Sequence, residues 1–276
     1  MDQKRSTVAD RRLNELGSFL AARRAEVTPT EVGLPHTGSR RLRGLRREEV
    51  AMLAGVGASW YAWIEQGRAK NVSPSVLSAI ANVLRLNEAQ RQYMMRMAGY
   101  AAPVVPGRTA VVDHELTGPV VDSFLPNPAY FLDRYWNIVA ANVAARRLLD
   151  VDGPCNYLDL LFGHPASRER FPHWEHEAAE AAGRLRAQRA ELLDDPVFEA
   201  LIRRLRAKSP AFTEVWDRHI VSNEAASVQT LHHPQLGRVS LQQLWLQIAA
   251  YPGLQLVLLH PGVRESAGRG TLRAAA

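Results

Sequence analysis

Apolar residues in the first hundred positions recur at the three- and four-residue spacing of amphipathic helices. A first helix is predicted over 10–25, with an apolar face formed by Leu13, Leu16, Phe19 and Leu20. A loop follows, rich in Pro and Gly, and it ends in the basic run SRRLRGLRREE. A second helix begins near Arg46 and ends before Gly55, a residue typical of helix C-termini, and its apolar stripe is Val50, Leu53 and Ala54.

Three more helices complete this pattern. One extends from about Gly57 to Gly67. The next begins with Ser73 as N-cap and Pro74 at the first helical position, a strong start signal. A fifth covers 87–98. The pattern therefore predicts a compact, mainly α, five-helix domain over 1–100.

The pattern changes after residue 100. The stretch 101–118 contains Pro and Gly without a clear period and is interpreted as a linker. AYFLDRYWNIVAAN predicts strands broken near Asp133 and Arg134. Short helices at VAARRLLD and YLDLLF come next, then long ones over 167–193, 195–209 and 212–221. Three strands close the segment, and the middle one, RVSLQQLWLQI, has apolar residues on both phases, which suggests a bulge. We expect an α+β domain over 119–263 and a flexible tail over 264–276.

The second and third predicted helices have the pattern of a helix-turn-helix. Small and apolar residues are available for their crossing: Val50, Ala51, Ala54, Val56, Tyr61 and Ile64. Tyr61 and Ile64 are three residues apart and share one face of the second helix of the pair. The opposite, outward face then consists of Ala58, Ser59, Ala62, Trp63 and Gln66. Trp60 fits either side. An ordinary helical hairpin would show the same spacing.

Charge favours the DNA-binding interpretation of this pair. Residues 1–100 contain 16 Lys and Arg against 9 Asp and Glu, whereas residues 101–276 contain 18 against 19, so the positive excess of the chain lies in its first third. Basic residues also flank both ends of the pair, as phosphates on either side of a groove would require: Arg40, Arg41, Arg43, Arg46, Arg47, Arg68 and Lys70.

LRREEVAMLAGVGASWYAWIEQGR followed by SPSVLSAIANVLRL resembles the xenobiotic-response-element (Cro/phage-repressor) class of DNA-binding domains. GLRREEVA, EQGR and the Arg-rich loop are similar to the actinobacterial MmyB-like regulators, and PNPAYFLDRYWNIVAAN, LLFGHPASRERFPHWE and HHPQLGRVSL extend the resemblance over roughly 10–262. The resemblance implies that Arg47 touches a phosphate, that Ala58, Ser59, Ala62 and Trp63 face bases, and that Gln66 contacts the DNA backbone. Gly57, Ala62 and Trp63 depart from the subgroup, which leaves the operator sequence open.

For the second domain the resemblance implies a PAS-like sensor with inserted helices that holds a small, fatty-acid-like ligand. Aromatic and histidine side chains are its candidate ligand-binding residues: Tyr130, Phe131, Trp136, Phe212, Trp216, His219, His232 and Trp245. Scattered aromatics fill ordinary cores as well, so lining and filling stay open.

Other chemistry has little support in the sequence. The lone Cys155 forms no internal disulfide and no Cys-based zinc site. His173 and His176 are three apart, not the four of HExxH, and no GxSxG, P-loop or Rossmann fingerprint occurs, so no catalytic residue, metal or cofactor is predicted.

We therefore expect a ligand-responsive transcription regulator that binds double-stranded DNA as a homodimer, because half-sites are read in pairs. With no signal-like or membrane-spanning apolar run, it is expected in the cytoplasm and not in a membrane. The alternatives are an enzyme fused to a DNA-targeting domain, and a protein-docking or dimerisation module without a ligand.

Overall fold

A computed structural model describes residues 7–35, 43–100, 114–164, 166–193, 195–222, 226–233 and 237–261. The chain divides into two compact units. Unit 1 comprises residues 1–104, 180–199 and 213–223, and unit 2 comprises residues 105–179, 200–212 and 224–276.

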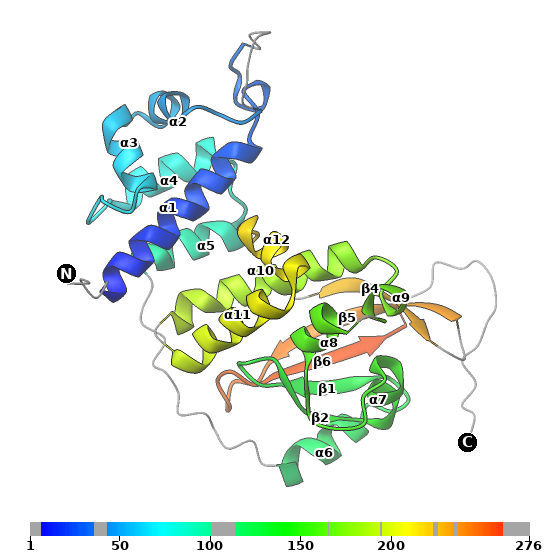
Figure 1. The fold of residues 1–276 in the computed structure, drawn as a ribbon. Coiled ribbons are helices and arrows are strands. Elements are labelled where there is room, and N and C mark those ends of the chain that lie inside the picture. The colour runs from blue at the N-terminus through cyan, green and yellow to red at the C-terminus, as the bar shows by residue number, and fades with distance from the viewer. Residues whose placement is uncertain are drawn as a thin grey trace. The chain divides into compact units, whose positions relative to one another are not determined.

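Unit 1 is built on a bundle of five α-helices, as predicted (Figure 1). Side-chain caps fix three of their starts: Thr7 accepts a hydrogen bond from the Asp10 amide, Ser73 from that of Val76, and Asn87 from that of Gln90. A short 3₁₀ helix at Thr30–Val32 lies in the loop after the first helix. The bundle consists of α1 (Val8–Glu26), α2 (Arg47–Ala54), α3 (Ala58–Glu65), α4 (Pro74–Val83) and α5 (Glu88–Met97).

The turn between α2 and α3 has the expected geometry. Gly55 caps α2 with a φ of 67°, a left-handed conformation that favours glycine, and the amide of Val56 donates to the carbonyl of Ala51. Tyr61 and Ile64 of α3 are fully buried in the core of the bundle. Leu53, which was expected on the apolar stripe of α2, is instead exposed, because the crossing is filled by Val50 and Ala51.

Two later segments of the chain complete unit 1. They belong to α10 (Trp174–Leu192), to the start of α11 (Pro196–Lys208), and to α12 (Pro210–Asp217) with the residues after it. Ala190 of α10 and Val221 are buried in the same hydrophobic cluster as α1 to α5. The DNA-binding bundle thus shares its core with residues nearly a hundred or more positions further along the chain.

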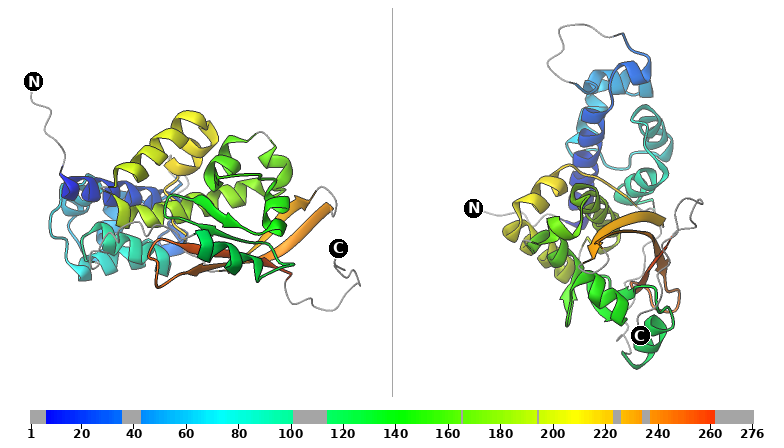
Figure 2. Two further views of the ribbon diagram at one scale, coloured as in Figure 1. Left: turned by 90° about the horizontal axis from the view of Figure 1, so that it is seen from below. Right: turned by 90° about the vertical axis from the view of Figure 1, so that its right-hand side faces the viewer.

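Unit 2 contains an antiparallel sheet in the order β3-β2-β1-β6-β5-β4 (Figures 1 and 2). Its strands are β1 (Ala129–Leu132), β2 (Asn137–Ala141), β3 (Cys155–Asn156), β4 (Ala226–His233), β5 (Gly237–Gln247) and β6 (Gln255–His260). The helices α7 (Val143–Leu149), α8 (Tyr157–Gly163) and α9 (Ser167–Arg170) are inserted between the second and fourth strands. A curled sheet with inserted helices confirms the PAS-like expectation.

The two faces of the sheet have different cover. On one face, Phe131 and Leu256 pack with Val121 of α6 (His114–Asp122) in a hydrophobic cluster. On the other face, Gln229 of β4 hydrogen-bonds side chains of α8 and α10. Successive residues of a strand therefore face either the α6 cluster or the side of α8 and α10.

Three sequence-based boundaries were wrong. The linker was placed over 101–118, but α6 begins at His114 and contains Pro119, because its apolar side packs on the sheet; residues 101–113 lie outside the described part. The helix over 167–193 is interrupted before Pro172, where Phe171 is extended, since proline restricts the residue before it. The helix over 212–221 ends at Asp217, ahead of His219 with its φ of 52°.

The bulge expected in the middle of the last three strands was also wrong. β5 pairs with β4 and β6 without interruption, and the register shift lies between Phe131 and Leu132 of β1. Leu241 is buried on the phase of Gln243, while Leu244 on the other phase pairs with Leu258 beside the α6 cluster. β5 therefore carries apolar residues on both phases without a bulge, although Leu246, on the phase of Leu244, is exposed.

The close crossing of α1 and α3 should leave no room for a side chain at Gly17. A Cβ on Gly17 would lie 2.2 Å from the carbonyl oxygen of Glu65, so Gly17→Ala should force the helices apart and lower the free energy of unfolding by about 1–3 kcal/mol. Urea denaturation measures this. Gly118→Ala in α6, where nothing lies within 4 Å, is the matched control and should be neutral or slightly stabilising. Equal effects of the two substitutions would contradict the close crossing.

Candidate functional site

The outward face of α3 is the surface predicted to read DNA. Ala58, Ser59 and Gln66 are exposed and Ala62 is half-buried, as expected. Trp63 is 50% exposed, and its ring lies edge-to-face with that of Trp60 at 6.2 Å between centroids. Trp60 is half-buried and packs against the hydrophobic core of unit 1, so it lies on the core side of α3. α3 therefore presents an apolar indole flanked by small residues.

A buried carboxylate holds α3 in place. The side chain of Glu65 is fully buried, and its oxygens accept hydrogen bonds from Nε of Arg24 at 2.5 Å and from Nε of Arg47 at 2.6 Å. Burial alone would raise the pKa of Glu65, but these two guanidinium groups lower it below its ordinary value. One carboxylate of α3 is thereby tied to α1 and α2.

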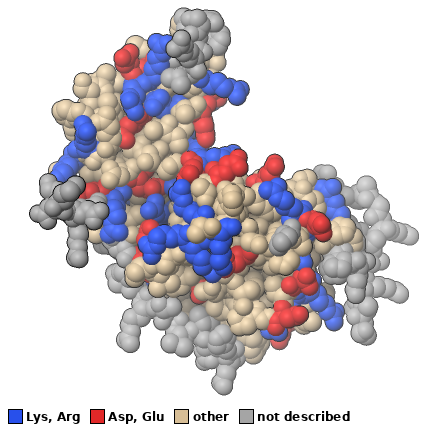
Figure 3. All heavy atoms as spheres, viewed as in Figure 1, with Lys and Arg blue, Asp and Glu red and all other residues tan. Residues whose placement is uncertain are grey.

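Positive charge frames this face. Arg43, Arg46, Arg68 and Lys70 are exposed, and Arg47 is half exposed while its Nε contacts Glu65. Figure 3 shows the surface around α3 as largely uncharged, with blue side chains to either side. Arg40 and Arg41 lie outside the described residues. An uncharged reading surface between cations suits a groove whose walls are phosphates.

A second candidate site lies in unit 2, where four aromatic side chains meet. Tyr130 stacks on Tyr157 with 6.1 Å between centroids, and Trp136 lies 6.0 Å from Tyr157 and 5.5 Å from Trp245. We call Tyr130, Trp136, Tyr157 and Trp245 the aromatic cluster. Tyr130, Trp136 and Tyr157 are fully buried, whereas Trp245 is only half-buried.

Polar side chains border the aromatic cluster. Nε2 of Gln229 donates to Oη of Tyr157 at 3.1 Å and to Oε2 of Glu177 at 2.9 Å. Gln243, on the neighbouring strand, donates to Oε1 of Gln229 at 3.4 Å. These amides and the carboxylate are buried beside aromatic rings, an arrangement that offers both apolar contact and hydrogen bonds.

The remaining predicted ligand residues lie apart from this cluster. Phe131 packs on the α6 side of the sheet, and His232 is exposed. Phe212 is buried edge-to-face against Phe162, with 5.0 Å between centroids. Trp216 and His219 belong to unit 1. The structure therefore brings together only Tyr130, Trp136 and Trp245 of the predicted set.

The polar partners at these two sites are distant from one another in the sequence. Arg24 and Glu65 are 41 positions apart, and no local pattern connects them. Gln229 and Gln243 lie on the buried phases of β4 and β5, in line with Leu231 and Leu241. Their positions in this alternating pattern are visible in the sequence. A polar residue on the buried phase of a strand indicates a partner inside the domain.

The surroundings of Cys155 and His173 bear on catalysis and metal binding. Burial raises the pKa of the Cys155 thiol, and Asp159 adds to that rise, which disfavours the nucleophilic thiolate. Nε2 of His173 lies 2.6 Å from Nη2 of Arg238. Within the described ranges, no three His, Cys, Asp or Glu side chains are placed to hold a metal ion, and no helix is long and apolar enough to cross a membrane.

Family comparisons agree with this geometry. A family model for a helix-turn-helix domain matches residues 15–94, and one for the MmyB-like transcription regulator ligand binding domain matches residues 115–274. The chain belongs to the MmyB-like transcription regulators. None of the curated proteins matches it.

As an MmyB-like regulator, the protein combines a DNA-binding domain with a ligand-sensing domain. The helix-turn-helix match covers α2 and α3 together with Glu15 and Arg24 of α1. The ligand-domain match covers all four residues of the aromatic cluster. It also covers α10 and α12, parts of which belong to unit 1.

The half-exposed guanidinium of Arg47 is expected to contact a DNA phosphate. If Arg47 contacts a phosphate as well as Glu65, Arg47→Ala should weaken binding to all duplexes similarly and make the salt dependence of affinity shallower by about one contact. Fluorescence anisotropy over a salt series measures this slope. Arg147→Ala, which removes an exposed cation of α7, is the control and should leave it unchanged. A loss of stability with an unaltered slope would show that Arg47 serves Glu65 alone.

Proposed function

We propose that this regulator reads duplex DNA with the outward face of α3. The supporting observation is a half-exposed Trp63 on a helix fixed by a buried, doubly paired Glu65 and flanked by exposed arginines. An indole ring contacts thymine methyl groups and sugars, and its N–H donates one hydrogen bond. Ser59 supplies a hydroxyl on the same face. The DNA backbone is contacted by Gln66, Arg43, Arg46, Arg68 and Lys70.

The protein acts as a homodimer in this proposal, because helix-turn-helix domains read two half-sites about one helical turn apart. It acts in the cytoplasm, where its DNA is accessible. A protein-docking role for the bundle would not require a framing set of cations. The architecture of a regulator, together with the raised pKa of the Cys155 thiol, favours binding over catalysis.

The ligand binds in unit 2 at the aromatic cluster. Tyr130, Trp136 and Trp245 contact an apolar, fatty-acid-like chain, since aromatic rings supply large apolar contact areas. Gln229 and Gln243 orient a polar end group. The carboxylate of Glu177 disfavours a second carboxylate nearby, so the end group is one that donates hydrogen bonds.

Substitution of Trp63 tests the reading face. On duplexes selected from random DNA by the wild-type protein, Trp63→Ala should relax base preference at one or two positions, at a cost of about 1–3 kcal/mol there. Its melting temperature should change little, because half of the side chain is already exposed. Tyr61→Ala is the contrasting variant and should lose stability, since Tyr61 is core. A destabilised Trp63→Ala protein with intact base preference would mean that Trp63 is a core residue and that another face of α3 is turned outward.

Organic extraction of the purified full chain, followed by mass spectrometry, tests the sensor. A co-purifying amphiphile is expected. Dodecanol and dodecylamine, added back, should raise the melting temperature more than dodecanoate does. A probe that binds should stabilise the folded protein by about 2.7 kcal/mol at a hundredfold excess over its dissociation constant. Trp245→Ala should reduce this shift, whereas Val143→Ala, at an exposed side chain of α7, should not. The sensor assignment fails if nothing co-purifies and no probe shifts the melting temperature.

A further inference from the structure

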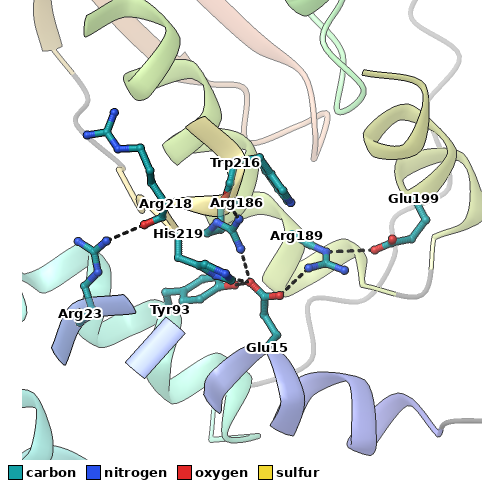
Figure 4. A network of polar contacts seen from close by, with 9 residues as sticks. All are labelled: Glu15, Arg23, Tyr93, Arg186, Arg189, Glu199, Trp216, Arg218 and His219. Atoms are coloured by element: carbon teal, nitrogen blue, oxygen red, sulfur yellow. Dashed lines mark hydrogen bonds and ion pairs between the residues drawn. The ribbon is translucent and has the colours of Figure 1, made fainter. Parts of the chain in front are cut away.

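A second buried carboxylate in unit 1 belongs to neither candidate site. Glu15 of α1 is 9% exposed and accepts hydrogen bonds from Arg186 of α10, from Nη1 of Arg189 at 2.6 Å and from Oη of Tyr93 at 2.6 Å (Figure 4). Nδ1 of His219 lies 3.7 Å from the same carboxylate. Three helices of unit 1 and the segment after α12 thus converge on one side chain.

The arginines around Glu15 are themselves held in place. Arg186 is fully buried, donates to the carbonyl of Trp216 at 2.5 Å, and lies 4.1 Å above the Trp216 ring. Arg189 also contacts Glu199 at 3.2 Å. Burial alone would raise the pKa of Glu15, but His219, Arg186, Arg189 and Tyr93 lower it well below its ordinary range, so the group is charged at neutral pH.

The helix that carries these arginines also carries Glu177. α10 is continuous from Trp174 to Leu192, and Glu177 in its first turn hydrogen-bonds Gln229 beside the aromatic cluster. Arg186 follows nine residues later, about two and a half turns along the same helix. A shift or rotation of α10 that starts at Glu177 would therefore change the pairing of Arg186 and Arg189 with Glu15.

An uncompensated buried charge is strongly unfavourable, so these pairings cannot be lost one at a time without cost. The energy of a buried carboxylate depends on the distance and direction of its hydrogen-bond donors, whereas apolar contacts are non-directional. Glu15 lies on α1, the helix that also holds Glu65 of α3 through Arg24. A displacement of α10 would thereby be passed to the helix that supports the reading face.

We propose that Glu15 is the positioning residue through which α10 acts on the DNA-binding helices of this regulator. This rests on the proposed function, in which α3 reads DNA and the aromatic cluster binds the effector. Glu15 touches neither DNA nor ligand. It links the segment that responds to the ligand with the bundle that binds DNA.

A double-mutant cycle on the full chain tests this without a known ligand. Glu177→Gln keeps the shape of the side chain but removes its charge, and serves as the perturbation at the start of α10. In the wild-type background it should change the dissociation constant for a selected duplex by about fivefold or more, the lower end of ordinary allosteric coupling. In the Glu15→Gln background the same substitution should change it by less than about twofold.

Glu26→Gln is the matched control, because Glu26 is also on α1 and paired with an arginine but is mostly exposed. In that background the effect of Glu177→Gln should persist. If Glu15→Gln does not fold, Arg189→Met at the more exposed arginine takes its place, with the same expectation. Equal effects of Glu177→Gln in all backgrounds, or no effect in the wild type, would overturn the proposal.

Hydrogen–deuterium exchange separates this outcome from a failure of the proposed function. Glu15→Gln should accelerate exchange together in α1 and in the second half of α10, whereas Glu26→Gln should not. If the wild type binds no duplex, the proposed function fails while exchange still tests the link. Acceleration confined to α1 would refute the link even if DNA binding is normal.

Discussion

Burial of a carboxylate is strongly unfavourable unless cations and hydrogen-bond donors surround it, and the described part of unit 1 buries two carboxylates. Glu65 is held by Arg24 and Arg47, and Glu15 by Arg186 and Arg189. Both groups depend on α1, which contributes Arg24 to the first and Glu15 itself to the second. The position of α3, and hence of Trp63, follows from the way α1 satisfies these two charges.

The same constraint explains why the DNA-binding bundle does not stop at residue 100. A five-helix domain alone would leave Glu15 with Tyr93 and without its arginines. The segments of α10 and α12 supply these cations, and Ala190 and Val221 extend the apolar core. The family match for the ligand-binding domain begins at residue 115, yet part of what it covers is structurally part of unit 1. The residue range of the ligand-binding family model therefore overlaps the structural unit that contains the DNA-binding bundle.

Local signals in the sequence were sufficient for the elements of the bundle. Ser73 and Pro74 marked the start of α4, and Gly55 marked the end of α2. The three-residue spacing of Tyr61 and Ile64 identified the buried face of α3 and placed Trp63 outside it. Such features depend on neighbours within one or two turns, and so they can be read from the chain.

The polar contacts could not be predicted in this way. Glu15 and Arg186 are 171 positions apart, and a glutamate on an amphipathic helix is ordinarily an exposed residue. His219 and Trp216 were assigned to the ligand site because aromatic and histidine residues suit a pocket, but tertiary packing places them near Glu15. In unit 2, Phe131 and Tyr130 are adjacent in sequence, and only the pairing of β1 decides which of them faces the aromatic cluster.

Photo-crosslinking from the reading face tests the central claim most directly. A benzophenone side chain introduced at position 63 of the full-length protein should crosslink to bases of a selected duplex, at defined positions in the major groove. The same group at position 143, where Val143 is similarly exposed on α7, should give no base crosslinks. Crosslinks from position 143 but none from position 63 would contradict the assignment of α3 as the DNA-reading helix.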